Sequence, residues 1–277
     1  MGEIDWEEFR RFLSKSCSEK TVGDRIRYAK EYGYCLASGD FSVINSLSDS
    51  KRGHSLKALS LLSKFLGIYD GFQKLKAAYG LNWRNTNAEE LILSRMEKTR
   101  ENRNVIEWIK EVKEKLPQLE VFMDFYLISG IRFNEAVNSY NLIIELSVKG
   151  GLDSYYKSEQ QALEHYRFKA LFIRRTKKVF LSYVPKRLVM KIRKKEKLSV
   201  FQVGHLIRRK RLQSRFGDVR EYFATFMTKF LNPAEIDFLQ GRVSARVFMR
   251  NYFNPALIQD LGKRALKGIN ELQAKIN

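Results

Sequence analysis

Residues 119–131 read Leu-Glu-Val-Phe-Met-Asp-Phe-Tyr-Leu-Ile-Ser-Gly-Ile and form one of the longest apolar runs of the chain. This apolar character predicts a buried helix, which Ser129 and Gly130 would end. The run is interrupted by charged and small polar residues, and it is shorter than the roughly 20 residues that a helix needs to cross a bilayer. We therefore expect a core helix and not a membrane span.

Around this run, the sequence predicts a mainly α protein. Helices are expected over residues 18–36, with Gly39 as the stop, and over residues 88–115. Leucine and phenylalanine recur at helical spacing over residues 56–66, which is typical of core packing. A last amphipathic helix is expected over about residues 255–276.

Residues 165–184 differ because apolar and polar residues alternate on both sides of a short basic turn. The turn is Thr176-Lys177-Lys178, and the alternation is carried by Phe168, Leu171 and Ile173 before it and by Val179, Leu181 and Tyr183 after it. A period of two on either side of a turn predicts a β-hairpin. The expected fold is therefore mainly α, with a helical N-terminal domain and an α+β domain, mostly helical with a small β-hairpin or sheet.

The positive charge is concentrated in one part of the sequence. The chain of 277 residues has 51 Lys and Arg against 31 Asp and Glu, a net charge of +20. The first 90 residues carry only +2, whereas residues 166–220 hold 19 basic residues against Glu196 and Asp218. Nucleic acid is the commonest partner of so dense a patch. A membrane surface is the rival, but the basic run 186–197 lacks the aromatic apolar face of an interfacial anchor.

Composition excludes several other classes of protein. An apolar fraction of 44% can fill real cores, so the chain is not a disordered basic tail. Cys17 and Cys35 make neither a disulfide framework nor a metal cage, and the three histidines are far apart in sequence. The acidic start of the chain is unlike an export signal. Composition therefore favours a cytoplasmic protein that binds a polyanion, with no metal and no cofactor.

The length favours two domains. Residues 82–87, Asn-Trp-Arg-Asn-Thr-Asn, are the best linker candidate. The expected division is a helical domain over residues 1–86, a second domain over 87–254 and a C-terminal helix over 255–277.

Three later segments together resemble motifs of the tyrosine recombinase (integrase) family. Residues 128–136 (Ile-Ser-Gly-Ile-Arg-Phe-Asn-Glu-Ala) are similar to its T-G-h-R-x-x-E-h motif, and residues 219–225 (Val-Arg-Glu-Tyr-Phe-Ala-Thr) to its L-R-h-x-F-A-T segment. Residues 239–242 (Leu-Gln-Gly-Arg), followed by Tyr252, are similar to its L-G-H…Y segment. Each piece alone is a weak signal, but their order and spacing strengthen one another. Arginine at position 242 and the sequence of residues 250–255 (Arg-Asn-Tyr-Phe-Asn-Pro) resemble the archaeal virus and plasmid branch of the family.

The resemblance covers about residues 100–277 and implies a site-specific recombinase or integrase. Such an enzyme cleaves and rejoins double-stranded DNA through a covalent 3′-phosphotyrosine intermediate, without metal or ATP. Residues 1–86 match the general pattern of a small helical domain that clamps DNA. The helix over 255–277 would dock into a neighbouring protomer and so build a tetramer on DNA, with packing on its own domain as the alternative.

The resemblance assigns Arg132, Arg220 and Arg242 to a clamp on the phosphate. Guanidinium groups meet phosphate oxygens in bidentate geometry and do not titrate, so several of them can stabilise the charge of the transition state. Glu135, one helical turn from Arg132, would hold this frame by an ion pair.

Tyr252 would be the nucleophile. A phenol with a pKa near 10 is a poor nucleophile at neutral pH, so neighbouring positive charge must stabilise the phenolate. Tyr222 is the nearest competitor, but it lies in the second-arginine segment, where the family has no nucleophile. Lys177 at the predicted hairpin tip would be the general acid for the leaving 5′-oxygen, with Lys178 as the alternate.

The sequence departs from the family pattern at Gly217, where a histidine or lysine usually stands three residues before the second arginine. The base that accepts the tyrosine proton is therefore left open between Arg215, His205, Lys229 and a water molecule.

Further basic residues are predicted to contact DNA phosphates. They are Arg174, Arg175, Lys178, Lys191, Arg193, Lys194, Lys195, Arg208, Arg209 and Lys210. Two other functions stay open. One is a non-catalytic DNA-binding or architectural protein with the same fold, which Gly217 favours. The other is a type IB topoisomerase-like enzyme, which shares the covalent chemistry.

Overall fold

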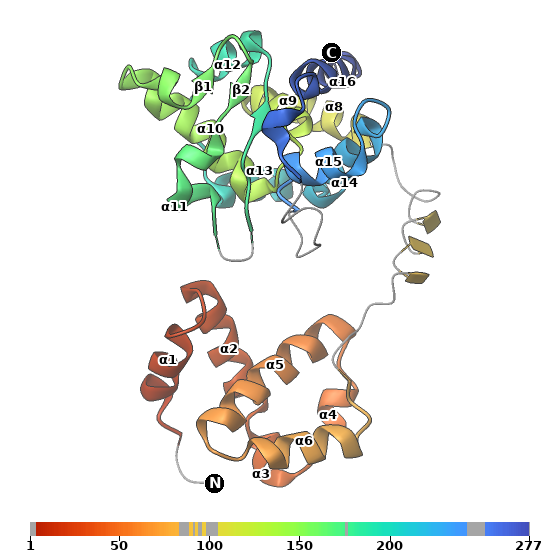
Figure 1. The fold of residues 1–277 in the computed structure, drawn as a ribbon. Coiled ribbons are helices and arrows are strands. Elements are labelled where there is room, and N and C mark those ends of the chain that lie inside the picture. The colour runs from red at the N-terminus through yellow and green to blue at the C-terminus, as the bar shows by residue number, and fades with distance from the viewer. Residues whose placement is uncertain are drawn as a thin grey trace. The chain divides into compact units, whose positions relative to one another are not determined.

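The computed structural model describes residues 4–82, 89–90, 92–93, 96–97, 105–174, 177–242 and 253–276. The chain divides into two compact units, Met1–Lys98 and Thr99–Asn277, here the N-terminal and C-terminal units. Both are built mainly from helices (Figure 1), and the C-terminal unit also holds a small sheet. The predicted fold class is thus confirmed. None of the helices in these ranges is long and apolar enough to span a membrane. Apart from Asn82, the predicted linker lies outside the described residues.

The helices of the N-terminal unit begin and end at capping residues. Asp5 and Ser18 accept backbone N–H groups at the starts of the first two helices. Gly39, with a φ of +71°, ends the third. The helix predicted over 18–36 is therefore present, divided at Gly33. The described elements are α1 (Trp6–Ser14), α2 (Glu19–Tyr32), α3 (Tyr34–Ser38), α4 (Ser42–Asn45), α5 (Asp49–Phe65) and α6 (Tyr69–Ala78).

Two hydrophobic clusters fill this unit where α1, α3 and α6 gather around the α2–α5 pair. Leu56, Leu59 and Leu62 of α5 are all buried, with Leu62 in one cluster and the other two in the second. The helical spacing over residues 56–66 therefore reflects core packing, as predicted.

The described part of the C-terminal unit runs through helices, three short strands and further helices. Its elements are α8 (Val105–Lys115), η1 (Pro117–Leu119), α9 (Glu120–Ser129), α10 (Phe133–Val148), η2 (Leu152–Ser154), β1 (Tyr156–Lys157), β2 (Ala162–Leu163), η3 (His165–Arg167), α11 (Lys169–Phe172), β3 (Ser182–Tyr183), α12 (Lys186–Ile192), α13 (Val200–Arg209), α14 (Phe216–Met227), α15 (Pro233–Leu239), η5 (Pro255–Leu257) and α16 (Leu261–Ala274). Of the helix predicted over 88–115, α8 is described, and most of residues 88–104 lie outside the described residues.

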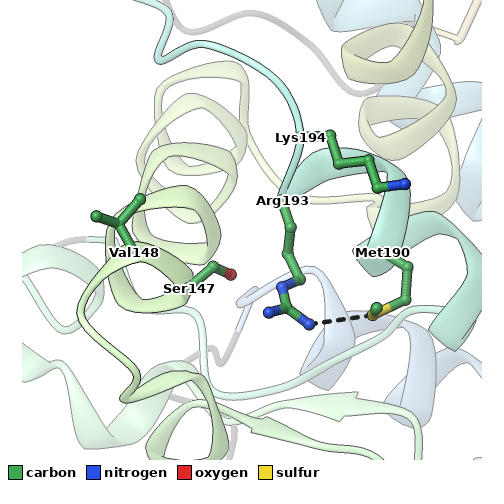
Figure 2. Close-up of a pocket in the computed structure, with 5 residues that line it drawn as sticks. All are labelled: Ser147, Val148, Met190, Arg193 and Lys194. Atoms are coloured by element: carbon green, nitrogen blue, oxygen red, sulfur yellow. Dashed lines mark hydrogen bonds between the residues drawn. The ribbon is translucent and has the colours of Figure 1, made fainter.

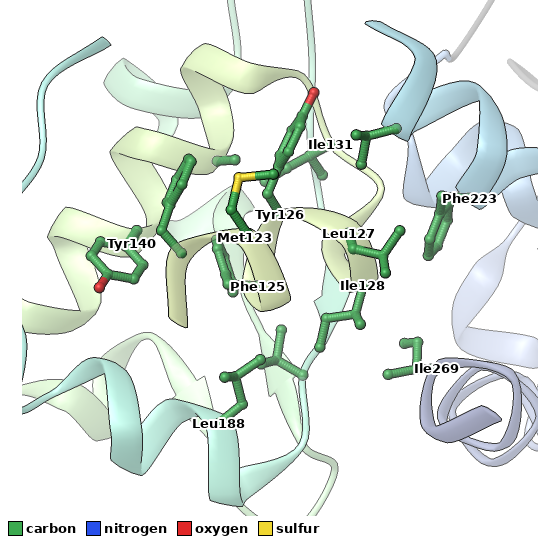
Figure 3. Packing of buried hydrophobic residues seen from close by; sticks show 14 of the residues in the cluster. Met123, Phe125, Tyr126, Leu127, Ile128, Ile131, Tyr140, Leu188, Phe223 and Ile269 are labelled. Carbon is green, nitrogen blue, oxygen red and sulfur yellow. The ribbon is translucent and has the colours of Figure 1, made fainter. Parts of the chain in front are cut away.

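Helix α9 is the centre of this unit, and every residue from Val121 to Ser129 is buried. Figure 3 shows its side chains surrounded by Tyr140 of α10, Leu188 of α12, Phe223 of α14 and Ile269 of α16. Because these neighbours come from distant parts of the sequence, α9 fixes the positions of four helices relative to one another. The prediction of a buried core helix is confirmed.

The buried charged side chain of α9, Asp124, is paired. Lys113 of α8 donates to its Oδ1 at 2.7 Å and also to the backbone oxygen of Ile276 at 3.0 Å. Burial raises the pKa of Asp124 despite the lysine. The pair therefore joins α8, α9 and the end of the α16 segment.

The sheet consists of β1, β2 and β3 in that order, all antiparallel, with Leu163 of β2 between Tyr156 and Ser182. Of the predicted hairpin, Ile173 and Lys178 form an antiparallel bridge, and the second arm leads into β3. Thr176 of the predicted turn lies outside the described residues. The predicted first arm is wrong, because it folds into η3 and α11. Phe168 and Phe172 are four residues apart, and both rings pack on Tyr155, a spacing that suits a helical turn.

Helix α16 packs on its own unit. Leu261, Ala265, Ile269 and Leu272 are buried against a core that includes α9 and α14. Leu257, which precedes this helix, remains exposed. The apolar face of α16 is thus buried on its own unit, and docking into a neighbour stays a prediction.

Candidate active site

Arg132 stands in the turn between α9 and α10, where it forms the N-cap of α10. Gly130, two residues earlier, has a φ of +64°, and a Cβ on it would lie 2.3 Å from the ring of Phe223 on α14. Glycine therefore allows the turn to lie directly against α14. The Nη2 of Arg132 donates to the backbone oxygen of Gly241 at 3.4 Å.

Arg220 lies on α14 and is only partly exposed. Its Nε donates to the backbone oxygen of Gly130 at 3.2 Å, and its Nη2 donates to that of Gln240 at 2.5 Å. Burial, followed by repulsion from Arg132 and Arg242, lowers the pKa of Arg220 to about 10. The guanidinium remains charged at neutral pH, and the cause of the shift indicates that the three arginines are close enough to repel one another.

The segments that carry the three arginines are thus joined by hydrogen bonds from Arg132 and Arg220. Arg220 bonds the segments that lead to Arg132 and to Arg242, and Arg132 bonds the residue before Arg242. Backbone carbonyls carry partial negative charge, so these bonds partly offset the repulsion between the cations. We call Arg132, Arg220 and Arg242 the arginine cluster.

The turn that carries Arg242 lies against the chain reversal between α11 and β3. Gly241 has a φ of +62°, and a Cβ on it would lie 1.5 Å from the backbone oxygen of Lys178. Arg242 itself is exposed. The tertiary fold therefore brings the predicted lysine pair next to the arginine cluster.

Lys177 and Lys178 lie at this chain reversal. Lys178 forms an antiparallel bridge with Ile173, and the backbone oxygen of Lys177 accepts from the N–H of Arg174 at 2.9 Å. Lys177 is exposed and Lys178 is half-buried. Arg175, predicted to contact DNA, lies outside the described residues.

Glu135 lies on α10, is fully buried and forms ion pairs with two arginines. Its Oε1 accepts from Nη2 of Arg174 at 2.6 Å, and its Oε2 lies 3.8 Å from Nη1 of Arg132. The guanidinium of Arg174 thus lies on this carboxylate and is still partly exposed, and its predicted DNA contact stays a prediction. The ion pair links the lysine-bearing reversal to the frame beneath Arg132.

Tyr252, the predicted nucleophile, lies outside the described residues. The next residue in the chain, Phe253, is partly buried, and its ring packs on Phe238 of α15 with 5.6 Å between centroids. Helix α15 ends immediately before the turn of Arg242. Tyr222, the competing tyrosine, stacks on Phe226 along α14, and burial raises its pKa.

Gly217 lies in the first turn of α14, and no atom lies within 4 Å of the place its Cβ would take. The three side chains weighed as replacement bases each have another contact. Arg215 donates to Asp218 at 2.8 Å, His205 stacks on Phe201, and Lys229 lies over the ring of Phe226.

The predicted DNA contacts on α12 and α13 are exposed. The first group, Lys191, Arg193, Lys194 and Lys195, lies at the end of α12 and just after it. The second group, Arg208, Arg209 and Lys210, lies at the end of α13. Figure 2 shows Arg193 bonded to the sulfur of Met190 at the rim of a shallow pocket of about 270 Å³, which Ser147, Val148 and Lys194 also line.

Two features of this site were not found from the sequence. One is the ion pair of Arg174 with Glu135, and the other is Gln240, whose buried side chain bonds the backbone of Arg220. The only sequence signal for Gln240 was its place in the Leu-Gln-Gly-Arg segment. Among the residues described, no three His, Cys, Asp or Glu side chains are placed to hold a metal ion.

Comparison with known proteins agrees with the motif reading. Residues 97–262 match the family described as archaeal phage integrase. This span includes Arg132, Arg220, Arg242 and both lysines of the chain reversal. No curated protein matches the chain.

Proposed function

The chain belongs to the archaeal phage integrase family, and we propose that it is a site-specific tyrosine recombinase that works through a 3′-phosphotyrosine bond. The family implies a recombinase that acts on DNA. The finer mechanism rests on the arginine cluster, in which Arg220 donates to backbone oxygens close to Arg132 and Arg242 in the sequence, and Arg132 donates to the residue before Arg242. The turn of Arg242 lies against the backbone of Lys178. We propose that it acts in the cytoplasm on double-stranded DNA and needs neither metal nor ATP.

The arginine cluster suits a scissile phosphodiester. Three guanidiniums that repel one another gain most from an anion placed between them, and burial strengthens that attraction. The cluster would hold the non-bridging oxygens as negative charge develops on them. Glu135 would orient Arg132 and, through Arg174, the chain reversal.

In the proposed reaction, the phenolate oxygen of Tyr252 attacks the phosphorus, and the bond to the 5′-oxygen breaks. Lys177 donates a proton to that oxygen, which leaves as a hydroxyl group. Because Gly217 offers no basic side chain, we assign the tyrosine proton to solvent water. The phosphotyrosine bond conserves the energy of the broken ester, so a 5′-hydroxyl can reverse the step and rejoin the strand.

The basic residues of α12 and α13 would hold the DNA backbone, and the N-terminal unit would clamp the duplex. The N-terminal unit has little net charge, so the C-terminal unit would supply most of the electrostatic affinity. We propose that the protein assembles as a tetramer on DNA, with α16 as the exchanged element.

A nicked suicide substrate tests this function. Wild type should form a covalent protein–DNA adduct in EDTA, Tyr252→Phe should form none, and Tyr222→Phe should behave as wild type. Mass spectrometry of the peptide left on the oligonucleotide should identify residue 252. An adduct at another residue would contradict the assignment.

A non-catalytic DNA-binding role is the second candidate. Gly217 stands where the family usually has a histidine or lysine, so this chain lacks a basic side chain at that position. Sequence-specific DNA binding without any adduct from wild type would establish it. Relaxation of plasmids that lack a specific site would instead indicate topoisomerase activity.

A further inference from the structure

Gln240 and Arg220 are joined by two reciprocal hydrogen bonds. The side-chain Nε2 of Gln240 donates to the backbone oxygen of Arg220 at 2.8 Å, and the backbone oxygen of Gln240 accepts from Nη2 of Arg220 at 2.5 Å. Gln240 is fully buried at the C-cap of α15, two residues before Arg242. The pair therefore fixes both the main chain and the guanidinium of Arg220 relative to the turn of Arg242.

These bonds also set the direction in which Arg220 presents its donors. The Nε of Arg220 donates to the backbone oxygen of Gly130, and its Nη2 donates to the backbone oxygen of Gln240. Within the described part of the chain, no hydrogen bond from Nη1 is seen. A planar guanidinium held on two of its nitrogens cannot rotate, so Nη1 keeps a fixed direction for a phosphate oxygen.

A glutamine at this place is a poor choice for packing alone. Its Oε1 is buried and accepts no hydrogen bond from a residue that the structure describes. An unpaired buried acceptor costs folding free energy, whereas an apolar side chain of the same length would not. The amide is therefore better explained by what it does to Arg220.

We propose that Gln240 is a positioning residue, which orients Arg220 of the arginine cluster toward the scissile phosphate. This inference rests on the proposed recombinase function. Gln240 touches no reacting atom in this role and acts through Arg220 alone.

The test is Gln240→Met, which keeps the length and the apolar stem and removes the amide. Single-turnover cleavage of the suicide substrate should fall about tenfold or more, short of the loss of about 10²–10³ typical of removing a clamp donor outright. The thermal midpoint should stay equal or rise, and binding of uncleaved DNA in the Tyr252→Phe background should be retained. Gln273→Met is the matched control. Gln273 is also buried, and its Oε1 accepts from Nη2 of Arg187, which is not part of the arginine cluster, at 2.8 Å.

A double-mutant cycle separates positioning from packing. In the Arg220→Ala background, Gln240→Met should cause no further loss of cleavage, because its partner is already absent. Additive losses, or a loss of cleavage that follows a fall in thermal midpoint, would overturn the inference in favour of packing. Equal cleavage by wild type and Gln240→Met would overturn it too, with the proposed function intact.

A second measurement does not depend on activity. In ¹⁵N spectra the Nε–H of Arg220 should exchange with solvent faster in Gln240→Met than in wild type. The substitution removes the amide bond that ties residue 240 to the main chain of Arg220, so the backbone oxygen of residue 240 holds the guanidinium less firmly. If wild type forms no adduct, the proposed function fails, and an unchanged exchange rate would then remove the positioning role as well.

Discussion

Gly241 and Lys178 approach so closely that a Cβ on the glycine would lie 1.5 Å from the lysine's backbone oxygen. Arg242 follows the glycine, and Lys177 precedes Lys178. One backbone contact therefore couples the third member of the arginine cluster to the proposed general acid, although the two segments are far apart in sequence.

Gly241→Ala should abolish this contact. The alanine would add the αL strain of about 1–2 kcal/mol and would also push the Arg242 turn away from the chain reversal. We expect cleavage to fall far more than stability alone explains. Gly150→Ala is the control, because Gly150 has a φ of +73° and no atom within 4 Å of its Cβ position. Equal effects of both variants on suicide-substrate cleavage would contradict the coupling.

Arg220→Lys should reduce cleavage by about 10²–10³, because one ammonium cannot hold two carbonyls in different directions and still meet a phosphate. Burial and the neighbouring arginines lower the pKa of Arg220, and they should lower that of a lysine there as well. The variant-to-wild-type ratio of cleavage rates should therefore improve as the pH falls. A ratio that is constant with pH, or an equal defect in Arg187→Lys, would argue against this account.

Arg174→Ala should slow cleavage of bound DNA more than it weakens binding, because Arg174 is bonded to Glu135. Glu135→Gln should have a similar effect, and the double variant should be no worse than the stronger single one. Lys194→Ala, on the exposed surface after α12, should weaken binding and leave cleavage of bound DNA unchanged. Filter binding and single-turnover kinetics together measure both quantities. A pure affinity defect in Arg174→Ala would support its predicted DNA contact and contradict a role through Glu135.

DNA affinity should fall steeply with salt. Replacing Lys191, Arg193, Lys194 and Lys195 by alanine should reduce the slope of log affinity against log salt by at most about 3–4, slightly under one unit for each phosphate contact. An unchanged slope in a fluorescence-anisotropy titration would remove this group from the interface.

His165 should make folding stability depend on pH. It is fully buried between Tyr155 and Ser182, at 2.7 and 2.9 Å, and burial lowers its pKa to about 3. Between about pH 3 and pH 6.5, the unfolded chain binds a proton on His165 that the folded protein does not bind. The stability that neutral His165 contributes is therefore complete above about pH 6.5 and is lost as the pH falls toward 3. Its slope approaches about 1.4 kcal/mol per pH unit.

Urea unfolding at pH 7 and pH 5 measures this dependence. His165→Gln should flatten it, and His205→Gln, at an exposed position on α13, is the matched control. An unchanged dependence in His165→Gln would show that other groups account for acid sensitivity.

Part of the fold could be predicted from local sequence because local forces decide it. The apolar run of α9 has no polar face to expose, so burial was the only stable outcome. Ser18 and Gly39 carry their capping chemistry with them. The first arm of the hairpin failed for the opposite reason. Its apolar residues fit a period of two as well as a helical turn, and packing of Phe168 and Phe172 on Tyr155 selected the turn.

The sequence by itself determined the residue types of the site: three arginines in recognisable segments, a lysine pair at a turn and an unusually basic stretch. Only the tertiary structure decided that Arg220 bonds the carbonyls beside Arg132 and Arg242, that Arg174 pairs with Glu135, and that Gly241 lies on Lys178. Such contacts join residues distant along the chain, and their geometry depends on how helices pack around α9. A linear pattern records periodicity and chemistry, but it does not record distances between segments.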